Sequence, residues 1–450
     1  MSLRDAIATY HDLLSDTCAA DSQAELEAQL HRRGLYFGTR PLTNVLRPRF
    51  LTPEQYRVLA RRVQVLLHAF QTAYEAALED PPLRAQFGLV EWEEELLRAS
   101  PGYREPSPTG RFDTFYLTDT GAFSLVEYNA ETPAAQAYND VLTDVFYTLP
   151  VMRAFQEHYD VRPLPSRHGV FHILCGAYEQ FTGQREKPRV AILDWKEVPT
   201  YSEFVLFADY LTSQGLEVVI ADPREVEYRN GQLVAGDFHI TLIYKRVLLS
   251  ELVDRMGLDS PVLQAVRDNA VCMVNPVRCK LLHKKASLAV LSDERNAHLF
   301  SGDQREAITA HIPWTRRLEE RRTLYHDGEV DLIPHVLEQR ERFVLKANDE
   351  YGGKGITLGW ETDAAGWERA IQAALAEPHV VQERVPVPSE PFPSLVNGAV
   401  VLADRMLDTD PFIYNGRYMD GCLTRLSTAA LLTVTAGGGS TVPSFVVEPR

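Results

Sequence analysis

The chain has 450 residues, of which 45% are hydrophobic and 24% charged, and these values predict a soluble globular protein with two or three domains. Its formal net charge of −16 argues against wrapping nucleic acid or binding an anionic membrane. The first residues lack a signal-peptide pattern, no apolar run is long enough to span a membrane, and the five cysteines include no C-x-x-C pair, which together predict a cytoplasmic protein with reduced thiols.

The N-terminal part of the chain is predicted to be helical. Residues 1 to about 100 repeat apolar side chains at three- and four-residue spacing. Thr52 followed by Pro53 is a typical helix start, because threonine can cap the first turn and proline fits the first helical position. Helical spacing returns over residues 133–155, after an intervening stretch of different character.

That intervening stretch, residues 110–129, indicates a β-hairpin. Two alternating runs flank the three-residue loop Asp119-Thr120-Gly121, whose glycine suits the left-handed position of such a loop. With this loop, Thr118 would pair with Ala122 and fix the register of the remaining residues.

From residue 188 onward the sequence predicts alternating strands and helices. Strands are predicted over 188–194, 216–221 and 239–247. The helix between the first two begins at an expected capping box formed by Thr200 and Glu203. These elements predict a β-α-β unit of Rossmann type that lacks the usual glycine fingerprint.

The C-terminal part mixes helices and strands. Residues 275–294 are predicted to be helical, and the proline-rich residues 385–394 to form an extended loop. Further elements are expected as strands over 343–348, 355–360 and 379–385, with a helix over 364–376.

The predicted hairpin register places charged side chains on one face. Asp113 lies opposite Glu127, and Arg111 lies opposite Asn129. Two carboxylates about 5 Å apart repel by roughly 3 kcal/mol at an effective dielectric near 20, unless a cation lies between them. Magnesium prefers such oxygen ligands, and the Asn129 carbonyl is a suitable third one.

The alternative is a solvent-facing hairpin edge, where polar side chains need no partner. The metal interpretation is favoured because the same predicted face carries apolar residues that indicate a covered surface, namely Phe115, Leu117, Phe123 and Leu125.

A lysine and a glycine-rich loop follow each other near residue 350. Lys346 lies inside a predicted strand, and Gly352-Gly353-Lys354-Gly355 follows it. Such loops direct backbone N–H groups toward phosphate, although neither the Walker pattern nor the dinucleotide pattern is matched. Alternatively, Lys346 extends its ammonium outward from an edge strand. If the loop and the hairpin meet, they predict a nucleotide site.

Together these motifs resemble the circularly permuted ATP-grasp proteins, which include the synthetase half of glutathionylspermidine synthase. The resemblance covers roughly residues 110–450. In ordinary ATP-grasp enzymes the E-x-N motif comes last, whereas here it precedes the lysines. The matching pieces are R-x-D (Arg111, Asp113), E-x-N (Glu127 to Asn129), a lysine helix around Lys285, Lys346 with the YGGKG loop, the VVQERV strand, and D-G-x-x-x-R with three glycines (Asp420, Gly421, Arg425, Gly437 to Gly439).

The resemblance implies an α+β / α/β fold class, a circularly permuted ATP-grasp fold. The implied division is a helical N-terminal region (1–105), a permuted metal-binding part (106–170), a Rossmann-like pre-ATP-grasp subdomain (171–274) and a nucleotide-binding part (275–450). The bifunctional relatives carry a cysteine-dependent amidase domain, for which Cys18 offers no catalytic context, so only the ligase half is expected.

The resemblance also implies roles for individual residues. Magnesium ligands would be Asp113, Glu127 and Asn129, and Arg111 would lie beside the γ-phosphate and the transferred carboxylate. Lys284 could take the place of Lys285 at the phosphates. Arg246 and Arg425 are possible substrate residues, or else structural ion pairs. The implied ATP-binding residues are Lys285, Lys346, Gly352, Gly353, Lys354, Gly355, Gln382, Glu383 and Arg384.

The implied activity is an ATP-dependent carboxylate–amine ligase that works through an acyl phosphate and releases ADP and phosphate. ATP and Mg²⁺ are the expected cofactors, and a small carboxylate and an amine the expected substrates, with no nucleic-acid or membrane partner. Two alternatives stay open: a phosphotransferase that uses the same ATP site, and a non-catalytic nucleotide-binding module.

Overall fold

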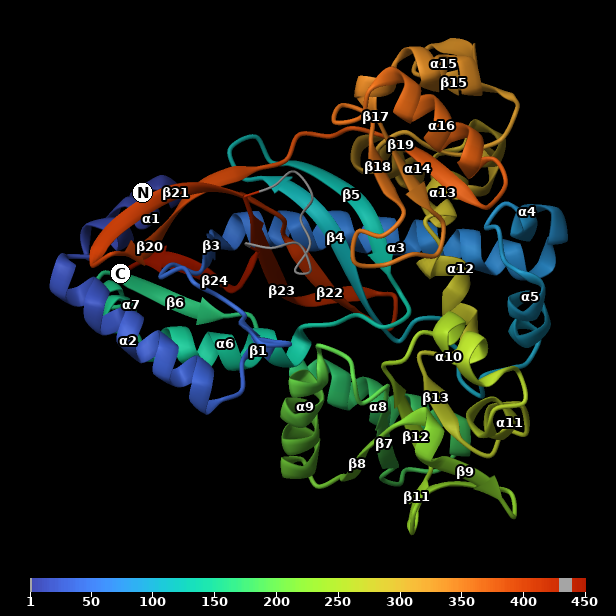
Figure 1. Cartoon of the computed structure of the whole chain (residues 1–450), viewed down its shortest axis with the longest axis horizontal. Helices are drawn as coiled ribbons and strands as arrows, with labels where there is room; N and C mark the ends of the chain where they lie inside the picture. Colours follow the sequence, from blue (N-terminus) through green and yellow to red (C-terminus); the bar gives the residue numbers. More distant parts are fainter. Residues whose placement is uncertain (1, 429–438) are drawn as a thin grey trace.

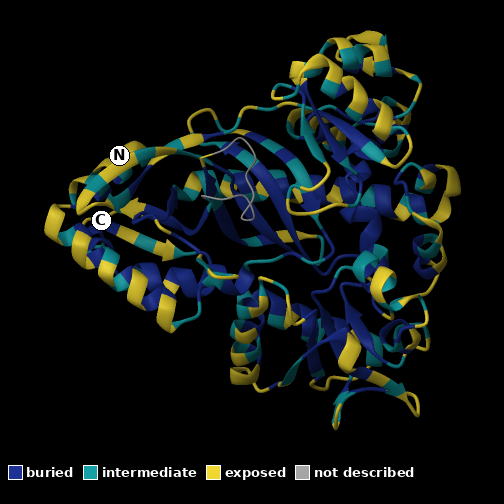
Figure 2. Cartoon of the chain, in the orientation of Figure 1, coloured by how far each residue is buried: buried dark blue, intermediate teal, exposed yellow. Residues whose placement is uncertain are grey.

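The computed structural model describes residues 2–428 and 439–450 of the chain. Three lobes surround a large central sheet: helices with the C-terminal strand, a small α/β lobe, and a lobe of mixed strands and helices (Figure 1). Buried residues follow the inner strands and the helix faces that cover them, while exposed residues lie on the outer helices (Figure 2). Within the described ranges, no helix combines the length and the apolar character needed to cross a membrane.

The N-terminal region is helical, as predicted. Its longest helix, α3, begins after Thr52, whose side chain accepts a hydrogen bond from the Gln55 backbone. One face of α3 packs against the central hairpin through residues such as Leu66 and Phe70. The elements here are α1 (Leu3–Asp12), α2 (Asp16–Arg32), β1 (Tyr36–Phe37), β2 (Arg40–Pro41), β3 (Arg49–Leu51), α3 (Pro53–Glu79), α4 (Pro81–Ala85) and α5 (Glu91–Leu97).

The central sheet joins the two halves of the chain. Its main path is β20-β21-β23-β22-β4-β5, and β24 links it to β3 and β6. Its strands are β4 (Thr109–Leu117), β5 (Ala122–Asn129), β6 (Tyr159–Pro163), β20 (Ser389–Val396), β21 (Ala399–Leu407), β22 (Asp410–Tyr414), β23 (Tyr418–Ser427) and β24 (Ser440–Pro449). The helices between β5 and the α/β lobe are α6 (Gln136–Thr148), α7 (Pro150–Phe155) and α8 (Arg167–Thr182).

The α/β lobe contains a parallel sheet in the order β13-β12-β7-β8. The chain runs outward from β7 to β8 and then returns to β12 on the other side of β7, so the strand order reverses between β7 and β12. The elements are β7 (Arg189–Leu193), α9 (Tyr201–Ser213), β8 (Glu217–Ala221), β9 (Val226–Arg229), β10 (Gln232–Ala235), β11 (Phe238–Ile240), β12 (Leu242–Lys245), α10 (Leu249–Met256), α11 (Pro261–Arg267) and β13 (Cys272–Val274).

The third lobe is built on an antiparallel sheet in the order β14-β19-β17-β18. Its helices lie on both faces of this sheet, because Val381 packs in one cluster with Trp367, whereas the adjacent Val380 packs with Ala289 on the opposite face (Figure 1). The elements are α12 (Lys280–His283), α13 (Ala286–Ser292), α14 (Gly302–His311), β14 (Thr315–Arg317), β15 (Arg322–Tyr325), β16 (Gly328–Asp331), α15 (Leu332–Glu338), β17 (Phe343–Ala347), β18 (Ile356–Leu358), α16 (Ala364–Ala374) and β19 (His379–Glu383).

The hairpin β4–β5 pairs Asp113 with Glu127 as predicted, but for a different reason. Leu117, not Thr118, pairs with Ala122, so the loop is one residue longer than expected. A register shift directly after Asp113 compensates for this difference.

The same shift turns two apolar side chains away from the charged face. Phe123 and Leu125 join the core with Phe112 and Tyr128. The prediction that they share a face with the carboxylates is therefore wrong, whereas Phe115 does lie on the side of the carboxylates.

Two expectations about the C-terminal part of the chain are also corrected. Residues 389–394 belong to strand β20, which contains Pro391 and Pro393 and lies at the edge of the sheet, where a missing N–H costs little. The predicted helix over 275–294 is broken at Lys284, whose extended ψ of 131° separates α12 from α13.

The capping box at the start of α9 is also absent. Thr200 makes no side-chain cap, because Glu203 instead accepts a hydrogen bond from the Ala137 backbone at the start of α6.

Candidate active site

A cavity of about 990 Å³ lies where the central hairpin faces the α/β lobe and the third lobe. Most of the predicted site residues line it, whereas Lys285 and Gly355 do not. Gly437 and Gly438 fall outside the described residues. The predicted residues at the cavity are Arg111, Asp113, Glu127, Asn129, Arg246, Lys346, Gly352, Gly353, Lys354, Gln382, Glu383, Arg384 and Arg425.

Asp113 is the most heavily bonded carboxylate of this face. Its Oδ1 accepts hydrogen bonds from Arg111 Nε at 2.8 Å and from Asn129 Nδ2 at 2.8 Å. Its Oδ2 accepts from Arg425 Nη2 at 2.7 Å. Burial alone would raise the pKa of Asp113, but the two guanidinium groups outweigh burial and hold that pKa well below its usual range. Asp113 is therefore ionised at neutral pH.

Glu127 lies beside one of two consecutive lysines, Lys284 and Lys285. Lys285 Nζ lies 3.1 Å from Glu127 Oε1 and also donates to the Glu350 carbonyl at 2.6 Å. Lys284 Nζ points elsewhere, to Glu93 at 2.8 Å and Asp349 at 2.9 Å. The break after α12 gives the two neighbours different directions, so the geometry favours Lys285 over Lys284 as the lysine beside the hairpin. Burial opposes ionisation of Glu127, yet the Lys285 ammonium keeps its pKa below the ordinary value.

Lys346 extends from β17 into the interior and reaches the hairpin. Its ammonium donates to Gln382 Oε1 at 2.7 Å and to the Val126 carbonyl at 3.1 Å. Burial lowers the pKa of Lys346 to about 8, because no carboxylate lies close enough to compensate fully. An anion that entered the cavity would gain a buried cation here. The alternative in which Lys346 extends outward to solvent is wrong.

The glycine loop connects β17 to β18 at the cavity. Gly352, Gly353 and Gly355 all have positive φ, between 63° and 84°, which side-chain-bearing residues adopt with strain. Tyr351 of this loop donates a hydrogen bond to Glu251 Oε1 at 2.9 Å, so the loop crosses from the third lobe to α10. The Lys354 ammonium lies 4.8 Å from the centroid of the Tyr351 ring.

The β19 strand provides the end of the cavity next to Lys346. Glu383 accepts a hydrogen bond from the Tyr325 hydroxyl at 2.7 Å. The Arg384 guanidinium lies 4.3 Å from the centroid of a Trp360 ring, which forms part of the same wall. A flat apolar wall beside backbone polar groups suits a heterocyclic base.

Arg246 follows β12 and reaches the loop before α6, which Arg111 also contacts. Arg246 donates to the Pro133 carbonyl, and Arg111 donates to the neighbouring Ala134 carbonyl at 3.1 Å. Ala135 has a φ of 79°, an uncommon value for a residue with a side chain, and it caps α6. Both guanidinium groups are thus held within one loop at the cavity wall. Glu203 Oε2 lies 3.7 Å from Arg246, so the arginine is partly compensated.

Arg425 is surrounded by three aspartates, two of which were not predicted as site residues. Besides Asp113, it pairs with Asp408 at 2.6 Å and Asp410 at 3.0 Å. Burial raises the pKa of Asp408 and of Asp410. The alternating Asp408-x-Asp410 pattern was the available signal in the sequence. Asp420, by contrast, is partly exposed and pairs with His168 at 3.2 Å.

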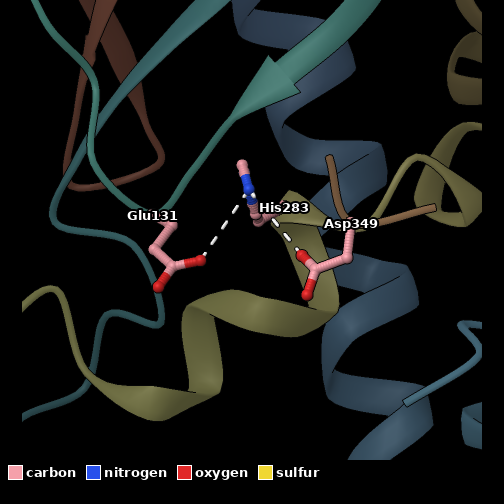
Figure 3. Close-up of side chains that lie close together, drawn as sticks. All are labelled: Glu131, His283 and Asp349. Atoms are coloured by element: carbon pink, nitrogen blue, oxygen red, sulfur yellow. Dashed lines mark ion pairs between the residues drawn. The ribbon is translucent and has the colours of Figure 1, made fainter. Parts of the chain in front are cut away.

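A buried charge cluster lies below the glycine loop (Figure 3). Glu131, His283 and Asp349 converge as a metal site would, with His283 between the two carboxylates. Lys280 Nζ, however, bonds both carboxylates, at 3.0 Å to Glu131 and 2.6 Å to Asp349. Burial lowers the pKa of His283 to about 4, so its ring is uncharged at neutral pH. The ammonium group of Lys280 therefore provides compensating charge to both acids, together with Lys245 at Glu131 and Lys284 at Asp349.

Lys280→Met should lower the free energy of unfolding by about 1.5–3 kcal/mol, because buried Glu131 and half-buried Asp349 lose their shared charge-assisted donor but keep Lys245 and Lys284 as partners. Urea unfolding followed by circular dichroism measures this change. Lys196→Met is the control, since Lys196 forms an exposed ion pair with Glu225 and its loss should leave the free energy of unfolding nearly unchanged. Equal stability of the two variants would show that the cluster contributes nothing.

Comparison with known proteins places the fold but not the family. No family model matches the chain, and no curated protein matches it. A solved structure, a glutathione synthetase-like effector from Globodera pallida, is 13% identical and superposes with a TM-score of 0.57, covering 94% of this chain and 96% of that one. The chain has a glutathione synthetase-like fold.

Two further solved structures also appear among the structural neighbours. A RimK-domain ATP-grasp protein from Sphaerobacter thermophilus is 16% identical, with a TM-score of 0.27 over 56% of this chain and 89% of that one. D-alanyl-alanine synthetase A from Vibrio cholerae is 10% identical, with a TM-score of 0.28 over 58% of this chain and 88% of that one. Superpositions this loose support no argument about the site.

Proposed function

We propose that the protein is an ATP-dependent carboxylate–amine ligase built on a circularly permuted ATP-grasp fold. The observation that carries the proposal is the convergence of three features on one cavity. These are the opposed pair Asp113 and Glu127, the buried ammonium of Lys346, and the positive-φ glycine loop. Two acids, a buried cation and a backbone cradle are the parts that a metal–nucleotide complex needs.

The hairpin residues fit a magnesium ion by the chemistry of their donors. Asp113 and Glu127 offer ionised oxygens on adjacent strands, and Asn129 offers an amide oxygen at the same end of the hairpin. When bound, the ion would neutralise phosphate charge and polarise the γ-phosphoryl group. Asp113 would then bind that ion while it also accepts hydrogen bonds from Arg111 and Arg425.

We place the adenine end of ATP at the strand that contains Gln382, Glu383 and Arg384. Lys346 and Lys285 would hold the phosphate chain, with the glycine loop above it. Lys346 supports this placement because its ammonium is buried and bonded only to neutral oxygens. The chain order, with the E-x-N hairpin before the lysines, supports the circular permutation.

The substrate carboxylate would lie between Arg111 and Arg246. Carbonyls of the loop that precedes α6 hold one nitrogen of each guanidinium group, while Arg111 also donates to Asp113 and Arg246 lies near Glu203. The N–H groups that these contacts do not use would bind the anion. A carboxylate held there could attack the γ-phosphate and become an acyl phosphate with a good leaving group. Arg111 would then stabilise the oxyanion that forms when an amine attacks the carbonyl carbon.

The affinity for a non-hydrolysable ATP analogue should fall as pH rises through about 8 and beyond. Lys346 is charged below its pKa of about 8 and loses its proton above it, and only the ammonium attracts phosphate. Isothermal titration between pH 7 and 9.5 measures the trend. In Lys346→Met the fall should be much shallower, whereas an equal fall in both proteins would assign it to other groups.

The proposed reaction is tested by a screen of acids and amines for ADP release. One acid–amine pair should give ADP and phosphate, never AMP and pyrophosphate, because the lysines hold the inner phosphates and leave the terminal one in reach. With the acid alone, hydroxylamine should trap the acyl phosphate as a hydroxamate. Formation of AMP, or of a stable phosphorylated product that no amine affects, would refute the ligase mechanism.

A further inference from the structure

Two carboxylates of the cavity differ from the others by having no cationic partner. Asp113, Glu127 and Asp408 each pair with an arginine or a lysine. Within the described ranges, Asp194 and Glu251 also line the cavity and form no ion pair. Asp194 is only 9% exposed, and its Oδ1 accepts a hydrogen bond from the Trp195 backbone N–H at 2.8 Å. A buried carboxylate that faces a cavity without a cation is poised to receive one.

The position of Asp194 in the fold points to ligand binding. It follows β7 directly, and Arg246 follows the neighbouring strand β12. The strand order reverses between these two parallel strands. In open parallel sheets, ligands bind in the crevice at the carboxyl ends of the strands where such a reversal occurs.

Glu251 belongs to the same subsite through Trp195. The Trp195 ring N–H donates to Glu251 Oε2 at 3.0 Å, while its backbone N–H bonds Asp194. Glu251 Oε1 accepts a hydrogen bond from the hydroxyl of Tyr351, in the glycine loop. This loop therefore covers the subsite on the side where the phosphates are proposed to bind. Burial raises the pKa of Asp194 to about 7, against the lowering effect of Arg246 and with a further rise from Glu251.

We propose that Asp194 binds the amine substrate in its ammonium form and accepts a proton from it. The proposal rests on the ligase function proposed above. Glu251 is a positioning residue that fixes Trp195 and adds a second negative charge beside the amine. A basic or neutral amine fits this subsite, and an amine whose nitrogen is flanked by a carboxylate does not, because the two acids would repel it.

The proposed step conserves atoms and charge. The ammonium gives one proton to the Asp194 carboxylate, and the freed nitrogen lone pair attacks the acyl-phosphate carbonyl carbon. The C–N bond forms and the C–O bond to phosphate breaks, with the bonding electrons leaving on phosphate. A second proton passes from nitrogen to the phosphate, so the products are the amide and hydrogen phosphate, and Asp194 returns its proton to water.

The first test is binding of n-butylammonium to the protein loaded with magnesium and a non-hydrolysable ATP analogue, with n-butanol as the uncharged probe. Wild type should bind the ammonium at least ten-fold more tightly than the alcohol, and Asp194→Asn should abolish that preference. Glu225→Gln is the matched control, an exposed acid of the same lobe. Asp194→Ser provides a second variant should the first fold poorly.

Titration of the ATP analogue in the same proteins separates the two proposals. Failure of wild type to bind the analogue would refute the nucleotide site itself. If wild type binds the analogue but shows no preference for the ammonium, or if Asp194→Asn retains the preference, the amine subsite is overturned while the nucleotide site stands.

A second readout uses hydroxylamine, which is largely uncharged at neutral pH and needs no base to expose its lone pair. In Asp194→Asn the ratio of the hydroxamate rate to the amide rate should rise at least 100-fold over wild type. A merely structural role would lower both rates together and leave the ratio unchanged, and that result would overturn the proposed proton transfer.

Discussion

Asp113→Asn and Glu127→Gln should each lower ATP turnover by about 100-fold or more while the protein stays folded. Each substitution keeps the shape of the side chain and removes one negative charge from the proposed magnesium site. In Glu127→Gln the Lys285 ammonium also loses its partner at 3.1 Å. Turnover of the acid–amine pair at saturating magnesium measures the effect, and thermal unfolding checks the fold.

Asp119→Asn is the matched control for this pair. Asp119 lies at the tip of the same hairpin, where its side chain is 68% exposed and pairs with Arg4. The ATP turnover of the Asp119→Asn variant should match that of wild type. Substantial turnover in both Asp113→Asn and Glu127→Gln would contradict the metal assignment.

Lys346→Met should weaken binding of a non-hydrolysable ATP analogue by about 10- to 100-fold. A buried charge-assisted hydrogen bond contributes roughly 1.5–3 kcal/mol, and methionine keeps the aliphatic part of the side chain. Lys285→Met should lose less, because that ammonium is already partly neutralised by Glu127. Isothermal titration gives all the affinities.

Lys354→Met is the comparison within the same loop. The Lys354 ammonium faces the Tyr351 ring and lies on the loop above the proposed phosphates, so its loss should mainly slow turnover and leave affinity nearly unchanged. If Lys346→Met bound the analogue as tightly as wild type, the cavity beside the glycine loop would not be a phosphate site.

The pairing of the two hairpin acids was predictable from strand alternation, because a period of two fixes which residues share a face. The register shift after Asp113 was not, since strand alternation alone does not reveal where one strand holds an extra residue. The prediction of the facing pair was thus confirmed although the predicted loop was one residue too short.

The directions of the site lysines could not be predicted from local sequence. Lys284 and Lys285 would lie on neighbouring parts of one helix, but the chain is extended at Lys284 and sends the two ammonium groups to different acids. Glu93 and Asp349, which attract Lys284, come from distant parts of the chain. Only the tertiary arrangement decides between the two lysines.

Glu203 shows how tertiary contacts replace a local rule. Its spacing from Thr200 matches a capping box, yet its carboxylate caps the start of α6 and faces Arg246. The neighbours of Arg425 illustrate the same limit: the arginine was a candidate, but Asp410 reaches it from the adjacent strand β22 and Asp408 from the connection between β21 and β22. Topological information of this kind also places Asp194 at the cavity.

The most direct test of the central claim follows oxygen-18 from the carboxylate of the acid that the screen identifies. If the carboxylate attacks the γ-phosphate of ATP, one labelled oxygen must remain on phosphorus when the amine displaces the phosphate, so the released phosphate should carry one oxygen-18 and the nucleotide product should be ADP. Mass spectrometry of the phosphate measures the transfer. Unlabelled phosphate together with a labelled amide, or label in AMP, would contradict the account.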